Sequence, residues 1–349
     1  MWAMEETARR AIWLRDDDFM AHNVPGHPER PERIRALEAE MSAAGWFGAE
    51  RVQAVEVERS LLLPVHPEAY IAFLETLCGD GGGAIDADTY AVPGTYGAAL
   101  RAAGGAAALV DALLGGEAEV GVSALRPPGH HAEAARAMGF CFFANAAVAA
   151  RRATVAHGLS RVMIVDWDVH HGNGTNDIFH ADDDVLFVSI HESPLYPGTG
   201  PAHDVGSEGG EGYTVNLPVP GGSGDATYRS LVEHVAGALI RTWEPELVLI
   251  SAGFDAHRDD PLATCRVSEA GFAGMAASLR RAADGVGAPV GVVLEGGYDL
   301  GALSRSMAAV MPVLMDGSTP SADAAQVDVH PLARDAVARL QPWWSGLSA

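Results

Sequence analysis

Four apolar runs of the sequence end in residues that can bind a metal or transfer a proton. The runs 162–165, 185–190, 247–250 and 290–294 have the composition of buried strands. The segments that follow them begin with or contain DWDVHH, HES, SAGFDAH and EGGYD. Carboxylates, imidazoles and a phenol placed together are the groups that metal-assisted hydrolysis uses.

The first of these segments offers ligands for a catalytic metal. Alternate side chains of an extended segment share one side, so Asp166, Asp168 and His170 point one way. The residues that point the other way are Trp167, Val169 and His171. Asp168 and His170, joined by Asp255 of SAGFD, provide two oxygens and one nitrogen. Three protein ligands leave a position for water, as in catalytic metal sites, and this donor set admits Zn²⁺, Fe²⁺ or Co²⁺.

A histidine pair and a tyrosine could move protons beside such a metal. His130 and His131 follow Pro-Pro-Gly, which precludes regular structure and fixes a loop. Two histidines can divide the roles of general base and general acid if unequal hydrogen-bond partners give the two rings different pKa values. Asp166 and Asn173 would be such partners. Tyr298 follows two glycines after the last apolar run, where its phenol could hydrogen-bond a developing oxyanion.

The elements that must position these residues alternate along the chain. Helical patterns separate the β runs, over 144–157, 227–243, 269–283 and 302–315. This rhythm predicts an α/β fold in which helices cover both faces of a mostly parallel sheet. Ligands bind such sheets beyond the carboxyl ends of the strands, so the polar segments should meet at one edge. We expect residues 1–349 to form one catalytic domain.

Composition limits the classes of partner. The net charge is −23, and all 23 basic residues are arginine. The absence of lysine excludes Schiff-base chemistry and a phosphate-loop lysine. The acidity argues against nucleic-acid binding and would suit cationic ligands, although ordinary solubility charge is the simpler explanation.

Sequence features also bear on the setting of the protein. No unbroken apolar run reaches the roughly 18 residues of a membrane span, and the N-terminal segment lacks a basic region followed by an apolar one. Cys78, Cys141 and Cys265 are scattered, without a CxxC pair. These features favour a cytoplasmic protein that is not membrane-bound. The sequence leaves the oligomeric state open, a homo-oligomer included.

In their order along the chain, these segments resemble the zinc-dependent histone deacetylase and acetylpolyamine amidohydrolase superfamily, whose members share an arginase-like fold. The likeness runs from HPERPERI through VHPEAYIAFL, DADTYAVPGTY, RPPGHHAE, MGFCFF, DWDVHHGNGT, YPGTG, GYTVNLPV and SAGFDAHRDDPLA to LEGGYDL. GHHAE, HHGNG and SAGFDAHRDDPL resemble the class II branch, as in bacterial-type deacetylases, more than class I. The resemblance implies a hydrolase that removes an acetyl or acyl group from an acyl-lysine-like amine.

The resemblance implies a role for each matching residue. Zinc would be bound by Asp168, His170 and Asp255. Protons would be handled by His130, held by Asp166, and by His131 near Asn173, with His131 as the general base. Tyr298 would polarise the substrate carbonyl opposite the metal.

The resemblance further implies a substrate channel and two potassium sites. Phe140 and Tyr196 would flank the channel, although the family commonly has phenylalanine where Tyr196 stands. Leu262 would line its rim, and Asp88 would anchor the substrate's backbone amides. Structural K⁺ would be held by the backbone or side chains of two groups of residues. The first group is Asp166, Asp168, His170, Ser189 and Ile190, and the second is Phe179, Asp182, Val185 and Tyr213.

Three alternatives remain open. An acetylpolyamine or small-amide deacetylase is one, but a strict polyamine enzyme would be expected to have an acidic residue where Leu262 stands. Asp88 and the overall acidity favour a cationic substrate instead. An arginase-type ureohydrolase with two metals is another. It would need a carboxylate side chain at the positions of Gly172 and His257, and neither residue has one. A non-enzymatic acyl-lysine-binding scaffold would be favoured if Tyr298 or the histidine pair were lost, but both are present.

Overall fold

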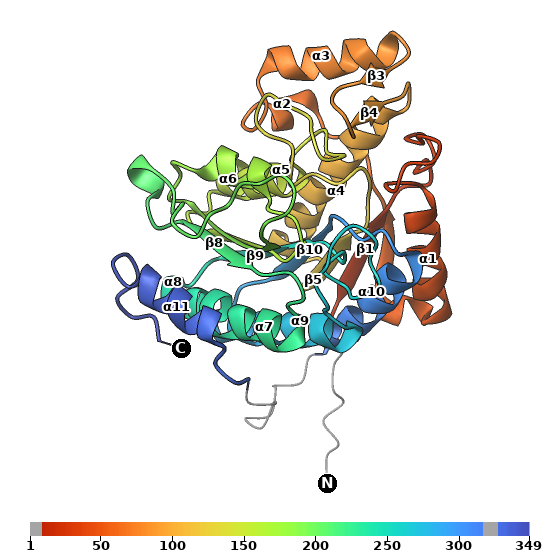
Figure 1. Cartoon of the computed structure of the whole chain (residues 1–349). Coiled ribbons are helices and arrows are strands. Elements are labelled where there is room, and N and C mark those ends of the chain that lie inside the picture. The colour runs from red at the N-terminus through yellow and green to blue at the C-terminus, as the bar shows by residue number, and fades with distance from the viewer. Residues whose placement is uncertain (1–8, 317–326, 349) are drawn as a thin grey trace.

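One parallel sheet organises the structure, a computed structural model that describes residues 9–316 and 327–348. Its strand order is β2-β1-β5-β10-β9-β6-β7-β8, and every neighbouring pair is parallel (Figure 1). The strands are β1 Ala11–Arg15, β2 Glu50–Gln53, β5 Val120–Ser123, β6 Val162–Asp166, β7 Val185–Glu192, β8 Thr214–Val219, β9 Leu247–Ala252 and β10 Val290–Leu294. The α/β prediction is confirmed, and β6, β7, β9 and β10 are the four predicted strands.

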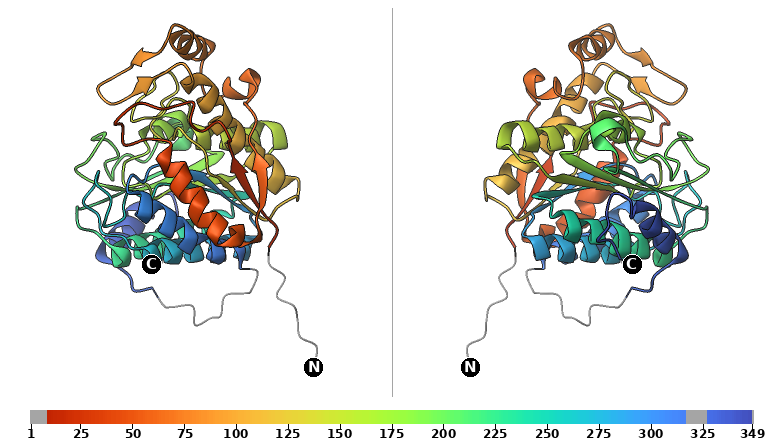
Figure 2. Two further views of the ribbon diagram at one scale, coloured as in Figure 1. Left: turned by 90° about the vertical axis from the view of Figure 1, so that its right-hand side faces the viewer. Right: turned by 90° about the vertical axis from the view of Figure 1, so that its left-hand side faces the viewer.

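Helices cover both faces of this sheet (Figures 1 and 2). One face packs against α4 Thr95–Leu114 and α5 Asn145–Arg151, with α6 Asn173–Phe179 nearby. The helices of the other face are α1 Glu32–Ala43, α7 Asp225–Leu231, α8 Gly237–Trp243, α9 Glu269–Val286, α10 Leu300–Met315 and α11 Pro331–Leu340. The strand residues alternate between the two layers, since Ile12 and Ile164 join the α4 side whereas Trp13 and Val165 join the α9 side.

Two of the predicted helices contain a wider turn. A π-helical turn, η2 Arg152–Ala156, continues α5, and a second, η4 Val232–Ala236, joins α7 to α8. Short 3₁₀ turns, η1 Gly45–Gly48 and η3 Glu208–Gly210, complete the regular structure. The predicted helical ranges are therefore confirmed, with a local change of hydrogen-bond spacing inside two of them.

A small lobe projects from the sheet and was not predicted (Figures 1 and 2). It consists of α2 Arg59–Leu62, α3 Glu68–Gly79 and the antiparallel pair β3 Gly83–Ala84 and β4 Tyr90–Ala91. His66, just before α3, joins the lobe to the loop that carries the histidine pair. Its Nδ1 lies 2.9 Å from the Ala134 carbonyl, and its Nε2 lies 3.0 Å from the Ala144 backbone nitrogen.

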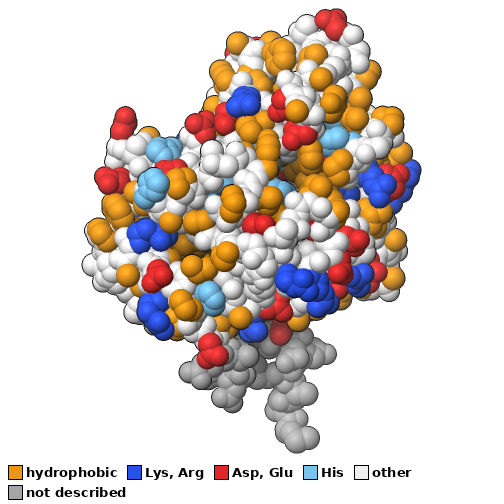
Figure 3. All heavy atoms as spheres, viewed as in Figure 1, with side chains coloured by type: hydrophobic (Ala, Val, Ile, Leu, Met, Phe, Trp, Pro, Cys, Tyr) orange, Lys and Arg blue, Asp and Glu red, His pale blue; other side chains and the backbone are white. Residues whose placement is uncertain are grey.

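Helix α4 is long and apolar enough, by length and composition alone, to cross a membrane. In the described structure 72% of its apolar window is buried against the rest of the protein. Core helices of globular proteins pass the same test, and α4 packs as one. On the face shown in Figure 3, acidic side chains are spread over the surface with arginines among them.

Candidate active site

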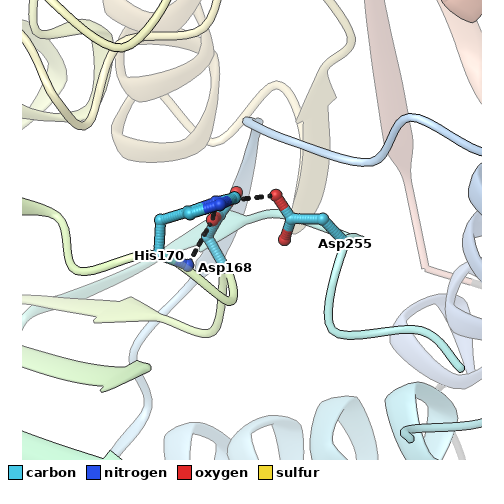
Figure 4. Close-up of side chains that lie close together, drawn as sticks. All are labelled: Asp168, His170 and Asp255. Atoms are coloured by element: carbon cyan, nitrogen blue, oxygen red, sulfur yellow. Dashed lines mark hydrogen bonds and ion pairs between the residues drawn. The ribbon is translucent and has the colours of Figure 1, made fainter. Parts of the chain in front are cut away.

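The three predicted metal ligands meet beyond the ends of two neighbouring strands (Figure 4). Asp168 and His170 follow β6, Asp255 follows β9, and these strands pair in parallel. His170 Nδ1 lies 3.1 Å from Asp168 Oδ1 and 3.2 Å from Asp255 Oδ2. One ligand atom from each residue lies within 4.8 Å of the other two, and all three residues are buried. The convergence expected from the parallel sheet is therefore present.

The charges of this group fit a bound cation. Asp255 Oδ1 accepts a hydrogen bond from the Val169 N–H, but its buried Oδ2 has no hydrogen-bond partner. Burial opposes a charged imidazole, yet the adjacent Asp168 and Asp255 raise the pKa of His170 to about 10. Two buried carboxylates facing one imidazole need compensating positive charge. A divalent metal would supply it, and the two-oxygen, one-nitrogen set suits zinc, iron or cobalt.

Two glycines make room for the ligand carboxylates. A Cβ atom on Gly253 would lie 1.9 Å from Asp168 Oδ2, and one on Gly296 would lie 2.1 Å from Asp255 Oδ2. The Gly296 N–H also donates to Asp168 Oδ2 at 2.8 Å. Any side chain at either glycine would therefore displace a ligand. The sequence carried this signal in SAGFD and EGGYD, but only the structure shows which carboxylates occupy the space.

The histidine pair lies beside this group with the two unequal partners expected. His130 Nδ1 is 3.0 Å from Asp166 Oδ2, and His131 Nδ1 is 2.8 Å from Asn173 Oδ1. Burial favours neutral rings, but Asp168 and Asp166 hold the pKa of His130 well above its ordinary value. Burial and the neighbouring His130 and His170 hold the pKa of His131 well below its ordinary value. The two rings thus differ in protonation, which suits one acid and one base.

A buried glutamate that sequence reasoning missed fixes the histidine loop. Glu295 Oε2 accepts hydrogen bonds from the Gly129 and His130 backbone N–H groups, at 2.6 and 3.1 Å. Its Oε1 accepts a hydrogen bond from the Ser251 hydroxyl at 2.7 Å. From the other side, the Gly174 N–H at the start of α6 donates to the His130 carbonyl at 2.9 Å. The backbone of the loop is thus held through both its N–H groups and its carbonyl at His130, which fixes the positions of the two imidazole rings.

Tyr298 lies where β10 leads into α10. Its backbone N–H donates to Asp260 Oδ2 at 2.6 Å, and the Asp299 side chain caps α10. The phenol ring packs edge-on against Phe140 at 5.7 Å and beneath the Arg33 guanidinium at 5.0 Å. Burial raises the pKa of Tyr298 well above its ordinary value, so the phenol stays a hydrogen-bond donor. Asp260 and Arg33 were not among the predicted residues.

A channel of about 220 Å³ leads to this chemistry. Its lining contains all four predicted channel residues, Asp88, Phe140, Tyr196 and Leu262, together with Gly139, Leu195, His131, His170 and Tyr298. Phe140 has a φ of 69°, a region that non-glycine residues seldom occupy. The Tyr196 ring packs edge-on against His131 at 5.1 Å. Leu195 and Gly139 are the lining residues that sequence reasoning did not name.

The structure also bears on the two-metal alternative. A Cβ atom on Gly172 would lie 2.3 Å from Asp166 Oδ2, so the Asp166 carboxylate already fills that space. His257 lies near α9, with its Nε2 3.4 Å from Glu269 and its ring stacked on Phe272. Within residues 9–316 and 327–348, Asp168, His170 and Asp255 form the one cluster with metal-binding spacing.

The residues predicted to hold potassium are engaged by neighbouring protein groups. The Phe179 carbonyl accepts a hydrogen bond from the Asp182 N–H at 3.0 Å, and the Tyr213 carbonyl accepts one from the Phe187 N–H at 2.8 Å. The Asp182 side chain pairs with Arg151 through Oδ2 at 2.6 Å and accepts hydrogen bonds from the Asp184 and Val185 N–H groups through Oδ1. Around the first predicted site, Asp166 Oδ1 accepts a hydrogen bond from the Asp168 N–H and Ser189 Oγ lies 3.0 Å from His191 Nδ1. Both potassium sites stay predictions.

Comparisons with known proteins agree with this geometry. Residues 27–314 match the family model described as histone deacetylase domain. The chain is 44% identical to histone deacetylase 15 of Arabidopsis thaliana over 84% of this chain, but it spans only 53% of that protein. It is 42% identical to a histone deacetylase-like amidohydrolase of Pseudomonas aeruginosa, over 78% of this chain and 73% of that one.

Further relatives extend the likeness to archaea and to a solved structure. A probable deacetylase of Archaeoglobus fulgidus is 40% identical, over 81% of this chain and 80% of that one. The crystal structure of the HDA15 HD domain superposes with a TM-score of 0.90 at 39% identity, over 98% of this chain and 97% of that one. Sequence, fold and the grouping of the site residues thus lead to one conclusion: the chain belongs to the histone deacetylase family.

Proposed function

We propose that the protein is a metal-dependent amidohydrolase that removes an acetyl or other acyl group from an acyl-lysine-like amine. One observation supports this most: His170 of the ligand group, His131 of the histidine pair and Tyr298 line the same channel, with Asp168 and Asp255 grouped around His170. A metal ion bound by Asp168, His170 and Asp255 would supply Lewis-acid chemistry to the acyl carbonyl and lower the pKa of a bound water.

The protein's own groups then divide the proton transfers. His131, kept neutral by burial and its cationic neighbours, is the general base. A protonated histidine of the pair then supplies the proton that the leaving amine takes, and Asp168 and Asp166 keep His130 protonated. The Tyr298 hydroxyl donates a hydrogen bond to the developing oxyanion. Phe140 and Tyr196 enclose the aliphatic part of the substrate and exclude water from its path.

The channel lining supports a lysine-like chain rather than a polyamine. Leu262 lies in the lining and is apolar, so the channel has no charge at the position where a strict polyamine enzyme would be expected to have an acidic residue. Phe140 and Leu195 add further apolar surface. Asp88 also lines the channel, where its carboxylate could accept hydrogen bonds from the backbone of a bound peptide. Acetylpolyamine hydrolysis is the second candidate because Asp88 would equally attract a distal ammonium group.

A comparison of substrates tests this proposal. An acetyl-lysine peptide, longer acyl-lysine peptides and acetylputrescine would be compared by kcat/KM on the zinc-loaded protein, with a chelated sample as control. The proposal predicts chelator-sensitive hydrolysis, with the peptide preferred over acetylputrescine. A preference for acetylputrescine would support the second candidate. Binding of acyl-lysine peptides without turnover, in protein of full metal content, would instead support a scaffold.

Metal content and cation dependence are tested on the same protein. We expect one divalent metal per chain, bound more weakly after Asp255→Asn substitution, and zinc, iron and cobalt would be compared by activity at equal occupancy. We also propose structural K⁺ at the two predicted sites. Replacing K⁺ by tetramethylammonium should lower the midpoint of thermal unfolding if either site binds the ion in solution.

A further inference from the structure

The amide of Asn173 lies between the proposed base and a residue outside the channel. Its Oδ1 is 2.8 Å from His131 Nδ1, and its Nδ2 donates to Glu133 Oε1 at 2.9 Å. Nδ2 also has longer contacts with Met138 Sδ at 3.4 Å and the His131 carbonyl at 3.5 Å. Glu133 thus provides the shortest of the contacts made by the Asn173 amino group.

The orientation of this amide decides which nitrogen of His131 carries a proton. With Oδ1 facing the ring, His131 Nδ1 must donate, so its proton is on Nδ1 and the lone pair is on Nε2. With the amide turned over, the NH₂ group would face Nδ1, and the neutral ring would have to carry its proton on Nε2. A ring in that second form could not accept a proton at Nε2. The base function of His131 therefore depends on the amide's orientation.

Glu133 selects the first orientation because a carboxylate can only accept hydrogen bonds. It attracts the Asn173 NH₂ group and would repel Oδ1. The loop around it is closed by backbone bonds, from the Glu133 N–H to the Arg136 carbonyl at 3.0 Å and from the Arg136 N–H to the Glu133 carbonyl at 3.4 Å. Asn173 and His131 are buried, whereas Glu133 is half-buried and lines an adjoining cavity of about 360 Å³ that shares Asp88 and Tyr196 with the channel. The carboxylate thus acts on the base from outside the channel.

We propose that Glu133 is a positioning residue that holds the Asn173 amide so that His131 keeps its proton on Nδ1 and its lone pair on Nε2. The proposal rests on the amidohydrolase function proposed above, since it assigns His131 the role of base. Glu133 itself contacts neither the channel nor the three metal ligands among the interactions of the described residues. Its effect is expected in kcat, with little change in KM or in metal content.

Glu133→Gln is the direct test because glutamine keeps the shape but can present either an oxygen or an NH₂ group to Asn173. We expect kcat to fall about 3- to 10-fold, with KM and metal content near those of the unchanged protein. Glu211→Gln makes the same chemical change at an exposed position and should leave kcat unaltered. Unaltered kcat in Glu133→Gln would overturn the proposal.

A second background separates positioning from a general structural role. In Asn173→Asp the side chain has no NH₂ group for Glu133 to orient, so adding Glu133→Gln should not lower kcat further. An equal additional fall in that background would refute the proposed route through Asn173.

A spectroscopic measurement keeps the proposal testable without turnover. Side-chain ¹⁵N chemical shifts of His131, assigned by loss of the signals in His131→Ala, report which nitrogen is protonated. We expect Nδ1 to be protonated in the unchanged protein and a mixture of forms in Glu133→Gln. Identical shifts in the two proteins would contradict the role of Glu133. Absence of hydrolysis with the expected shift change would instead contradict only the proposed function.

Discussion

One added methyl group at Gly172 should strongly lower the activity without touching a proposed ligand of the divalent metal. The φ of Gly172 is −73°, so the backbone itself tolerates alanine. The new Cβ atom, however, would lie 2.3 Å from Asp166 Oδ2, 3.1 Å from Phe187 Cζ and 3.4 Å from His130 Nδ1. Asp166 and Phe187 are fully buried, so neither can move into solvent. The conflict must be resolved inside the site.

The size of the effect follows from these distances. Restoring an ordinary contact requires the Asp166 carboxylate to move by about 1 Å, more than its 3.0 Å bond to His130 can absorb. Overpacking of this kind costs about 1–3 kcal/mol of unfolding free energy. General acid–base catalysis contributes about 10²- to 10⁴-fold to rate, so a disturbed His130–Asp166 pair should lower kcat about 100-fold.

Three measurements on Gly172→Ala check this reasoning: kcat with an acyl-lysine peptide, denaturant unfolding and metal content. Gly285→Ala is the matched control, because Gly285 lies exposed in α9 and no atom outside the neighbouring backbone of that helix lies within 4 Å of the position that an alanine Cβ would take. The control should be neutral or gain up to about 1 kcal/mol of stability, as alanine favours helix. Near-normal kcat in Gly172→Ala would refute the claim that Asp166 and His130 cannot separate. A large loss in Gly285→Ala would show that the effect at Gly172 does not arise from contact with Asp166 and His130.

Three further substitutions address other parts of the site. Tyr298→Phe should lower kcat by about 10²- to 10³-fold with full metal content, as for loss of one oxyanion donor, and normal turnover would refute its role. Asp255→Asn should weaken metal binding by more than about 10-fold, measured by competition with a chromophoric chelator, whereas unaltered affinity would remove Asp255 from the ligand set. Burial lowers the pKa of His66 from 6.5 to about 4, so folding favours the neutral ring, and the stability it contributes above pH 6.5 is lost as the pH falls toward 4. The unfolding free energy should fall by about 3 kcal/mol over this pH range. Denaturant unfolding of His66→Gln, measured at a series of pH values, should not show this fall. A pH profile identical to that of the unchanged protein would exclude His66 as its source.

Much of the site could be predicted because its residues follow strands that the sequence reveals. The apolar runs that became β6 and β9 are uninterrupted, and parallel pairing brings their ends together whatever the rest of the chain does. The alternation predicted through 166–171 is also present, since Trp167 and Val169 lie in the core while Asp168 and His170 meet Asp255.

The residues that were missed act through contacts that no local pattern encodes. Glu295 belongs to the predicted segment LEGGYDL, yet its bonds to Gly129 and His130 span more than 160 positions of the chain. Arg33 reaches the Tyr298 ring from α1 across a still larger separation in the sequence. The lobe around α2 and α3 escaped prediction because α2 has only four residues and the lobe is held by long-range contacts such as His66 with Ala144. Tertiary packing, rather than periodicity, decides such positions.

The segment after β6 serves the core and the site with alternate side chains. Trp167 packs edge-on against Phe254 at 6.4 Å and lies near Phe272 at 6.2 Å, whereas its neighbour Asp168 is a proposed ligand. A mutational screen scored by activity alone would therefore rank Trp167 with the catalytic residues, although it never meets a substrate. Engineering this family member for heat resistance would have to begin on strands remote from β6. Repacking near Trp167 should change the positions of the proposed ligands and the stability of the fold together.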